Sequence, residues 1–219
     1  MSRARMRITF GKGPQLRYIS HLDLALTWER ALRRARVPLA YSQGHNPHAK
    51  LQLASGLPLG YTGSAEVMDV ILTASISPEE FIACVDLTLP EGLNIASAEE
   101  VPLKAPSLQS VLRQAVYRVS VETSLPETEL KRRIANLLAS DVLEQERVRK
   151  GRVEIFDLRP LVHDVQLLAV NDGQAVFCMR LSAGQHGNVR PDAVTTALGL
   201  ESEFSQVERT RLLFEFDSP

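Results

Sequence analysis

The chain has 219 residues, of which 44% are hydrophobic and 23% are charged. This composition can bury a sizeable core, which argues against a predominantly disordered protein. No apolar run reaches the roughly 18 residues that a membrane helix needs, and no secretory leader is evident. We therefore expect a cytoplasmic protein with no membrane association.

The net charge of -1 conceals a strong local asymmetry. Residues 1–50 contain ten Lys or Arg and two Asp or Glu, whereas residues 51–110 contain one and eight. A local basic excess of this size can attract a polyanion. The alternative is that the acidic segment folds back and neutralises the basic one.

The sequence of the first half predicts a series of strands and helices. Residues 6–10 alternate apolar and polar side chains, which predicts a half-buried strand. Ser20 is a good N-cap and Asp23 follows three residues later, so we expect a helix from about His21 to Arg36, ended by Pro38.

Further elements follow at residues 50–54 (strand), 65–74 (strand), 78–89 (helix) and 93–97 (strand). The order strand, helix, strand, strand, helix, strand is that of a ferredoxin-like (split βαβ) domain. We therefore predict one such unit over residues 1–101, followed by a linker.

The second half repeats this order without any similarity between the residues. Expected strands and helices lie at 115–122 (strand), 126–139 (helix), 153–158 (strand), 162–181 (hairpin around Asp172-Gly173), 191–198 (helix) and 205–216 (strand). The sequence thus predicts an α+β fold of two tandem ferredoxin-like units, the second over residues 107–219.

The first predicted helix carries a cationic face. Asp23, Thr27, Arg30 and Arg34 fall on one side of a helical wheel. Arg30 and Arg34 are one turn apart, a spacing suited to gripping a phosphate backbone. The alternative is a solvated helix face paired to acids of the second segment.

The segment after this helix is polar and contains two histidines. Asn46-Pro47 is a turn former, but His48 and Lys50 add little to a turn and bring donors and positive charge. We take Asn46, His48 and Lys50, with Arg190 in the second half, as candidate nucleic-acid or anion-binding residues. The histidine spacing matches no zinc signature, so we predict neither a metal nor a cofactor.

An enzymatic alternative uses the start of the first helix. His21 would act as general acid or base, held by Asp23, while His48 and Lys50 bind an anionic substrate. The competing interpretation is that Asp23 stabilises the helix N-terminus and His21 is an edge residue. Walker, G-x-S-x-G and C-x-x-C motifs are absent, which argues against the commonest nucleotide-dependent and nucleophilic enzymes.

Several of these motifs together resemble a known family. They are Arg17-Tyr18-Ile19-Ser20-His21-Leu22-Asp23, Glu29 to Ala35, Pro38 to Gly44, Asn46-Pro47, Ala54 to Gly60, Glu66 to Asp69 and Gly187 to Pro191. The chain resembles the radical-SAM-linked family of uncharacterised bacterial proteins over nearly its whole length.

The resemblance implies a unit that occurs alone or fused behind a radical-SAM module. Two positions depart from the family pattern: His45 replaces the usual phenylalanine, and Ala49 replaces the usual proline. Because the chain has no radical-SAM cluster motif, any iron–sulfur chemistry would belong to a partner.

These observations favour a cytoplasmic RNA-binding or substrate-presenting module that acts with a radical-SAM or RNA-processing enzyme. The alternatives are the small enzyme described above and a protein-docking scaffold. DNA is not an expected partner. Tyr18, Tyr41 and Phe10 do not form an RNP-like cluster, so the sequence predicts no typical aromatic platform for RNA bases.

Overall fold

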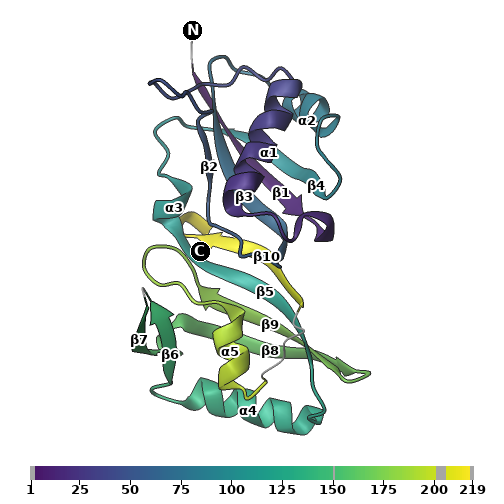
Figure 1. The fold of residues 1–219 in the computed structure, drawn as a ribbon, viewed down its shortest axis with the longest axis vertical. Coiled ribbons are helices and arrows are strands. Elements are labelled where there is room, and N and C mark those ends of the chain that lie inside the picture. The colour runs from purple at the N-terminus through teal and green to yellow at the C-terminus, as the bar shows by residue number, and fades with distance from the viewer. Residues whose placement is uncertain (1–2, 150, 201–205, 218–219) are drawn as a thin grey trace. The chain divides into compact units, whose positions relative to one another are not determined.

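The computed structural model describes residues 3–149, 151–200 and 206–217 (Figure 1). It is a mixed α+β structure with mostly antiparallel strands and few helices. The chain divides into two compact units, Met1–Leu112 with Phe214–Pro219, and Arg113–Leu213.

The first unit is built on an antiparallel sheet. Its strands are β1 (Ala4–Lys12), β2 (Leu51–Leu53), β3 (Thr62–Leu72) and β4 (Leu93–Val101), and its helices are α1 (His21–Arg34), α2 (Pro78–Asp86) and α3 (Leu108–Val111), with a 3₁₀ turn at Pro14–Leu16. The sheet order is β4-β1-β3-β2, and each neighbouring pair is antiparallel.

Helices α1 and α2 cover one face of this sheet, as Figure 1 shows. Their apolar stripes pack on the side chains of β1 and β3 that point to that face, because successive strand residues point to opposite faces. Trp28 is fully buried and meets Phe10 edge to face, with ring centroids 5.0 Å apart. Burial of this stripe orients α1 and leaves its other faces to solvent.

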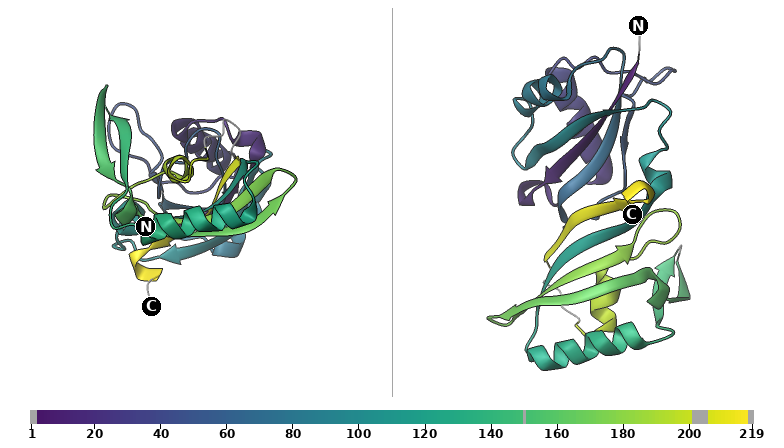
Figure 2. Two further views of the ribbon diagram at one scale, coloured as in Figure 1. Left: turned by 90° about the horizontal axis from the view of Figure 1, so that it is seen from below. Right: turned by 180° about the vertical axis from the view of Figure 1, so that it is seen from behind.

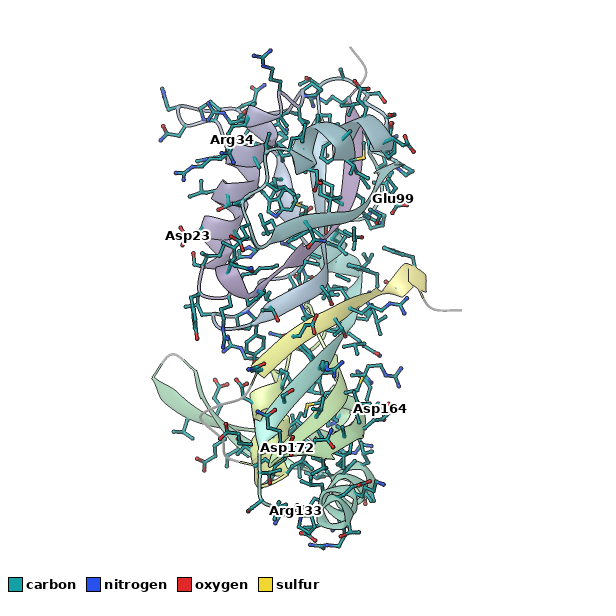
Figure 3. The ribbon with its side chains drawn as sticks, turned by 90° about the vertical axis from the view of Figure 1, so that its right-hand side faces the viewer. Asp23, Arg34, Glu99, Arg133, Asp164 and Asp172 are labelled. Carbon is teal, nitrogen blue, oxygen red and sulfur yellow. The ribbon has the colours of Figure 1, made fainter. Side chains whose placement is uncertain are left out.

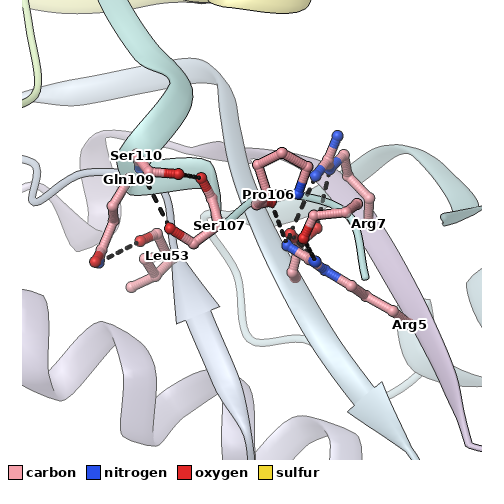
Figure 4. Close-up of polar contacts among 9 residues, drawn as sticks. Arg5, Arg7, Leu53, Pro106, Ser107, Gln109 and Ser110 are labelled. Carbon is pink, nitrogen blue, oxygen red and sulfur yellow. Dashed lines mark hydrogen bonds and ion pairs between the residues drawn. The ribbon is translucent and has the colours of Figure 1, made fainter. Parts of the chain in front are cut away.

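The opposite face of the sheet carries charged side chains. Arg5 and Arg7 of β1 both donate to the carboxylate of Asp69 on β3, from Nε atoms at 3.0 and 2.9 Å. Arg5 also donates to the carbonyl of Pro106 at 3.0 Å, and Figure 4 shows these contacts. The triad ties the segment before α3 to the sheet.

The second unit has a similar succession of elements. Its strands are β5 (Leu112–Glu122), β6 (Glu144–Arg149), β7 (Arg152–Asp157), β8 (Val162–Asn171), β9 (Gln174–Ser182) and β10 (Gln206–Phe214), and its helices are α4 (Glu127–Ala139) and α5 (Pro191–Ala197). The strand order is β10-β5-β9-β8, while β6 and β7 form a separate hairpin (Figure 2). The tight turn at Asp172-Gly173 joins β8 to β9, and both residues have positive φ.

Two elements were not predicted. Helix α3 lies where the sequence suggested the start of a new unit, and its Leu108 is fully buried while Gln109 donates to the carbonyl of Leu53 at 3.2 Å. These contacts place residues up to 112 in the first unit, beyond the predicted boundary at 101. Strand β6 is rich in charged residues and has weak strand propensity, but it pairs with β7.

The C-terminal residues also differ from the predicted domain limits. The second unit was expected to run from 107 to 219, whereas Phe214–Pro219 belongs to the first unit. Phe216 stacks on Phe214 with centroids 5.2 Å apart, and the Arg7 guanidinium carbon lies 5.3 Å from the Phe216 ring centre. These aromatic contacts hold the segment against β1.

Candidate nucleic-acid interface

The exposed side of α1 forms a ridge that changes character along its length. Leu22, Leu26, Arg30 and Arg34 follow one another at intervals of four residues, so their side chains lie along one helical ridge. Leu22 is 73% exposed and Leu26 46%, and both arginines are exposed. The ridge is therefore apolar toward the helix N-terminus and cationic toward its C-terminus.

The cationic end of the ridge borders a hollow of about 630 Å³. Its lining residues are Thr27, Arg30, Arg33, Arg34 and Pro90. Arg34 donates from Nη2 to the carbonyl of Thr88 at 2.6 Å, so its guanidinium is held near the wall formed by Pro90. Arg30 and Arg34, which the sequence analysis paired, lie together here, and Arg33 joins them.

The arginines of this hollow are not neutralised by carboxylates. Within the described part of the chain, Arg30, Arg33 and Arg34 have no ion-pair partner. The acidic segment does pair with the basic one at the sheet, through Asp69 with Arg5 and Arg7. Neutralisation therefore occurs at the strands and leaves the positive charge of α1 facing solvent.

The N-terminus of α1 is capped within the chain. Ser20 Oγ accepts from the backbone N–H of Asp23 at 3.1 Å and donates to its carboxylate at 2.7 Å. His21 is exposed, beside Gly56, and no hydrogen bond in the described structure joins it to Asp23. Asp23 is thus engaged in helix capping, and Figure 3 labels it on α1 together with Arg34.

The polar loop after α1 closes on itself. Ser42 donates from its N–H to the carbonyl of His48 at 2.8 Å, and the N–H of His48 donates to Ser42 Oγ at 3.0 Å. An isolated bridge between Tyr41 and Ala49 continues this pairing. Asn46 lies at the exposed tip, and His48 lies at the base.

Lys50 lies on a different surface from the arginines of α1. It borders a second hollow, of about 410 Å³, with Arg5, Gln52, Asp69 and Ser107 among the lining residues. Gln52 pairs with Asp69 across β2 and β3, on the sheet face opposite to α1. The sheet therefore separates Lys50 from Arg30 and Arg34, although the sequence predicted anion binding at all three residues.

Arg190 belongs to the second unit. It is exposed and occupies the N-cap position of α5, where its side chain makes no capping hydrogen bond. Within the first unit, the structure thus brings Arg30 and Arg34 together and leaves Lys50 apart from them.

Tyr18, to which the sequence analysis gave no role because it lacks an RNP-like cluster, is an exposed aromatic side chain just before α1. Tyr18 is 73% exposed, and the Arg17 guanidinium carbon lies 4.9 Å from its ring centre. The backbone N–H of Gly60 donates to the carbonyl of Arg17 at 2.8 Å, which fixes the segment just before α1. The adjacent Arg17-Tyr18 pair was the available signal, since arginine stacks readily on aromatic rings.

The structure also describes the arrangement of potential metal ligands, the two thiols and the hydropathy of the helices. Residues 3–149, 151–200 and 206–217 contain no group of three or more His, Cys, Asp or Glu side chains arranged to hold a metal ion. Cys84 and Cys178 are free thiols, and burial raises the pKa of each. Among these same ranges, no helix has the length and hydropathy needed to span a bilayer.

The sequence from residue 5 to residue 191 matches a family model described as "Uncharacterized protein conserved in bacteria (DUF2344)". The chain belongs to this family. No curated protein sequence matches this DUF2344 chain.

Solved structures with a similar fold are distant in sequence. A chain in "Crystal Structure of a Cbf5-Nop10-Gar1 Complex" is 13% identical, with a TM-score of 0.53 over 94% of the DUF2344 chain and 48% of that chain. A chain in "Structure of H/ACA RNP bound to a substrate RNA containing 2'-deoxyuridine" is 14% identical, with a TM-score of 0.48 and coverage of 94% and 47%. The DUF2344 chain spans about half the length of these chains, and the likeness concerns the fold alone.

Proposed function

We propose that this DUF2344 protein is a cytoplasmic RNA-binding or substrate-presenting module that binds phosphates at the α1 hollow. The observation that carries the proposal is the set of unpaired cations there. Arg30, Arg33 and Arg34 line one hollow of about 630 Å³ with Thr27 and have no carboxylate partner among the described residues. Guanidinium groups bind phosphate oxygens with several directed donors.

Several features of the hollow suit a polyanion better than a small metabolite. The three arginines come from one helix and face solvent, so they form a stripe that can follow a phosphate backbone. Arg34 is already held by the carbonyl of Thr88, which reduces the side-chain entropy lost on binding. Thr27 donates its hydroxyl to the carbonyl of Asp23 at 2.7 Å, and its oxygen remains beside the hollow.

The enzymatic alternative has less support from the geometry. A general acid or base at His21 needs an orienting group, and the Asp23 carboxylate instead accepts from Ser20. Lys50, the expected anion-binding partner of His21, lies at the hollow on the other sheet face. We therefore favour phosphate binding at Arg30 and Arg34 over catalysis by His21.

The proposed function also concerns the fold of the two units and the protein partner. We propose that each unit is a ferredoxin-like (split βαβ) domain, with the β6–β7 hairpin as an insertion in the second. The strand orders β4-β1-β3-β2 and β10-β5-β9-β8 support this assignment. The protein partner in this proposal is a radical-SAM or RNA-processing enzyme to which the bound RNA is presented.

The test is equilibrium binding of a fluorescently labelled, mixed-sequence RNA over a range of salt concentrations. We expect log K to fall linearly with log salt for the wild-type protein. The Arg30→Ala/Arg34→Ala variant should bind more weakly and lower the slope by about 1.4, at about 0.7 per phosphate of single-stranded RNA.

The control is Lys131→Ala/Arg132→Ala, which removes two positive charges from exposed positions of α4 in the second unit. It changes the net charge equally but should leave the slope unchanged. Circular dichroism of both variants checks that they fold. Salt-independent binding, or equal losses in the two variants, would contradict the proposal.

A further inference from the structure

We infer that the RNA bound at α1 is single-stranded and that one of its bases stacks on Tyr18. This inference rests on the proposed function and specifies its ligand. It follows from an exposed aromatic ring just before α1, two exposed leucines on that helix and the cationic hollow near its C-terminal end.

Tyr18 offers a supported stacking surface. The Arg17 guanidinium covers its ring at 4.9 Å, and the ring is 73% exposed, so one face is backed while solvent reaches the remainder. A β carbon at Gly60 would lie 3.9 Å from the ring, so the glycine loop passes beside it. An exposed aromatic ring supported in this way suits a nucleobase, whose flat face stacks without sequence preference.

Exposed leucines lie on α1 between Tyr18 and the arginines, beside the capped carboxylate of Asp23. Leu22 and Leu26 occupy the two turns of the α1 ridge that precede Arg30, and Leu59, beside Gly60, is 62% exposed. Apolar side chains suit the faces and edges of unstacked bases, whereas a duplex exposes chiefly phosphates and sugars to a flat surface. The ridge therefore provides base contacts and phosphate contacts at different positions.

The length of α1 determines how many RNA nucleotides are needed to contact both of its ends. Arg30 lies nine residues after His21, or about 14 Å along the helix axis at 1.5 Å per residue. At a rise of about 3.4 Å per nucleotide, a stacked RNA strand needs at least about four nucleotides to span this length of α1, from its first residue to Arg30. Shorter oligonucleotides can satisfy the base contact or the phosphate contacts, but not both.

The experiment measures the binding of labelled oligouridylates of increasing length, and of the duplex that the longest one forms with oligoadenylate. The single strand should bind more tightly than the duplex, and its affinity should fall sharply below about four nucleotides. Tyr18→Ala should weaken single-strand binding about 5- to 150-fold, the range measured for loss of one base–aromatic stack.

Two further variants, Tyr18→Phe and Tyr41→Ala, and the salt dependence of binding separate stacking from charge. Tyr18→Phe keeps the ring and should bind within about twofold of the wild type, since stacking does not need the hydroxyl. Tyr18→Ala should leave the salt slope unchanged, whereas Arg30→Ala/Arg34→Ala lowers it. Tyr41→Ala, which removes another exposed tyrosine of the first unit, is the matched control and should have no effect.

The outcomes distinguish this inference from the proposed function. If RNA binding is salt-sensitive and needs Arg30 and Arg34, but duplex binds equally and Tyr18→Ala behaves as Tyr41→Ala, the single-strand inference is wrong and the proposed function stands. If neither RNA binds to the folded wild-type protein, both are wrong. Displacement of the single strand by polyglutamate at equal charge would also overturn the inference, because carboxylates supply charge without stacking.

Discussion

The Asp69 carboxylate lies between two guanidinium groups, with its Oδ2 3.0 Å from Nε of Arg5 and its Oδ1 2.9 Å from Nε of Arg7. Asp69 is 2% exposed and Arg5 is 5% exposed, so the pair is almost fully removed from water. Buried charges of this kind depend on one another, because each would otherwise lose its hydration without compensation.

Replacing Asp69 should therefore be costly. We expect Asp69→Asn to destabilise the protein by about 3–5 kcal/mol, the range for removing one partner of a buried ion pair. Chemical denaturation monitored by circular dichroism measures the change. Glu99→Gln, an exposed carboxylate across the strand pair from Arg7, should change stability by less than about 0.5 kcal/mol. Similar values for the two variants would contradict the role of the triad.

The Ser20 cap provides a second prediction. Ser20→Ala removes an acceptor for the Asp23 N–H and should cost about 1 kcal/mol, as for other N-cap serines. Ser97→Ala, at an exposed position of β4, is the control and should be close to neutral. A loss of helicity without a matching loss of RNA affinity would show that the cap and the arginine hollow act independently.

Two glycines with different neighbours allow a matched comparison. A β carbon on Gly63 would lie 2.7–3.0 Å from three side-chain atoms of Glu66, which is 3% exposed and cannot move freely. We expect Gly63→Ala to destabilise the protein by about 1–3 kcal/mol through overpacking. Gly11→Ala would meet the amide of Asn94, an exposed side chain that can rotate away, and should have a much smaller effect. Thermal unfolding of both variants tests this difference.

The stability of the second unit should depend on pH through Glu129. Hydrogen bonds from Arg132 and Arg133 lower the pKa of Glu129 to about 2 from the usual 4.5. Because the folded-state pKa is lower, its stabilising contribution is present above about pH 4.5 and is lost as the pH falls toward 2. Glu129→Gln should flatten the dependence of melting temperature on pH in this window.

High salt provides the control for Glu129. This carboxylate and both arginines are partly solvent-exposed, so added salt should screen them and reduce the difference between wild type and variant. An identical pH profile for the two proteins at low salt would show that Glu129 contributes nothing to folding.

Helix α1 could be predicted from the sequence because its structure depends on residues close together in the chain. The cap at Ser20, the apolar stripe through Trp28 and the pairing of Arg30 with Arg34 all depend on spacing within one helix. The mixed α+β class and the hairpin at Asp172-Gly173 also depend on local signals. These features are present in the structure at or close to the expected residues.

Features that depend on which strands pair could not be predicted from local sequence patterns. Lys50 comes soon after α1 in the sequence. Side chains alternate along β2, however, so Gln52, two residues after Lys50, lies on the sheet face opposite to α1, and Lys50 borders the same hollow as Gln52. Strand β6 forms because β7 supplies a partner, although its own residues are mostly charged. The loop around Gly60 lies beside Tyr18 and bonds to the carbonyl of Arg17, a proximity that no local sequence pattern specifies.

The contacts of Phe214 and Phe216 have a consequence for biosynthesis. The strands of the first unit are complete by Val101, but the aromatic segment that covers Arg7 is translated after the entire second unit. A nascent chain that has emerged only through β4 therefore leaves this part of the sheet open to water. We expect the first unit to acquire its final protection from proteases after the second unit has been synthesised, which links the maturation of the two units in time.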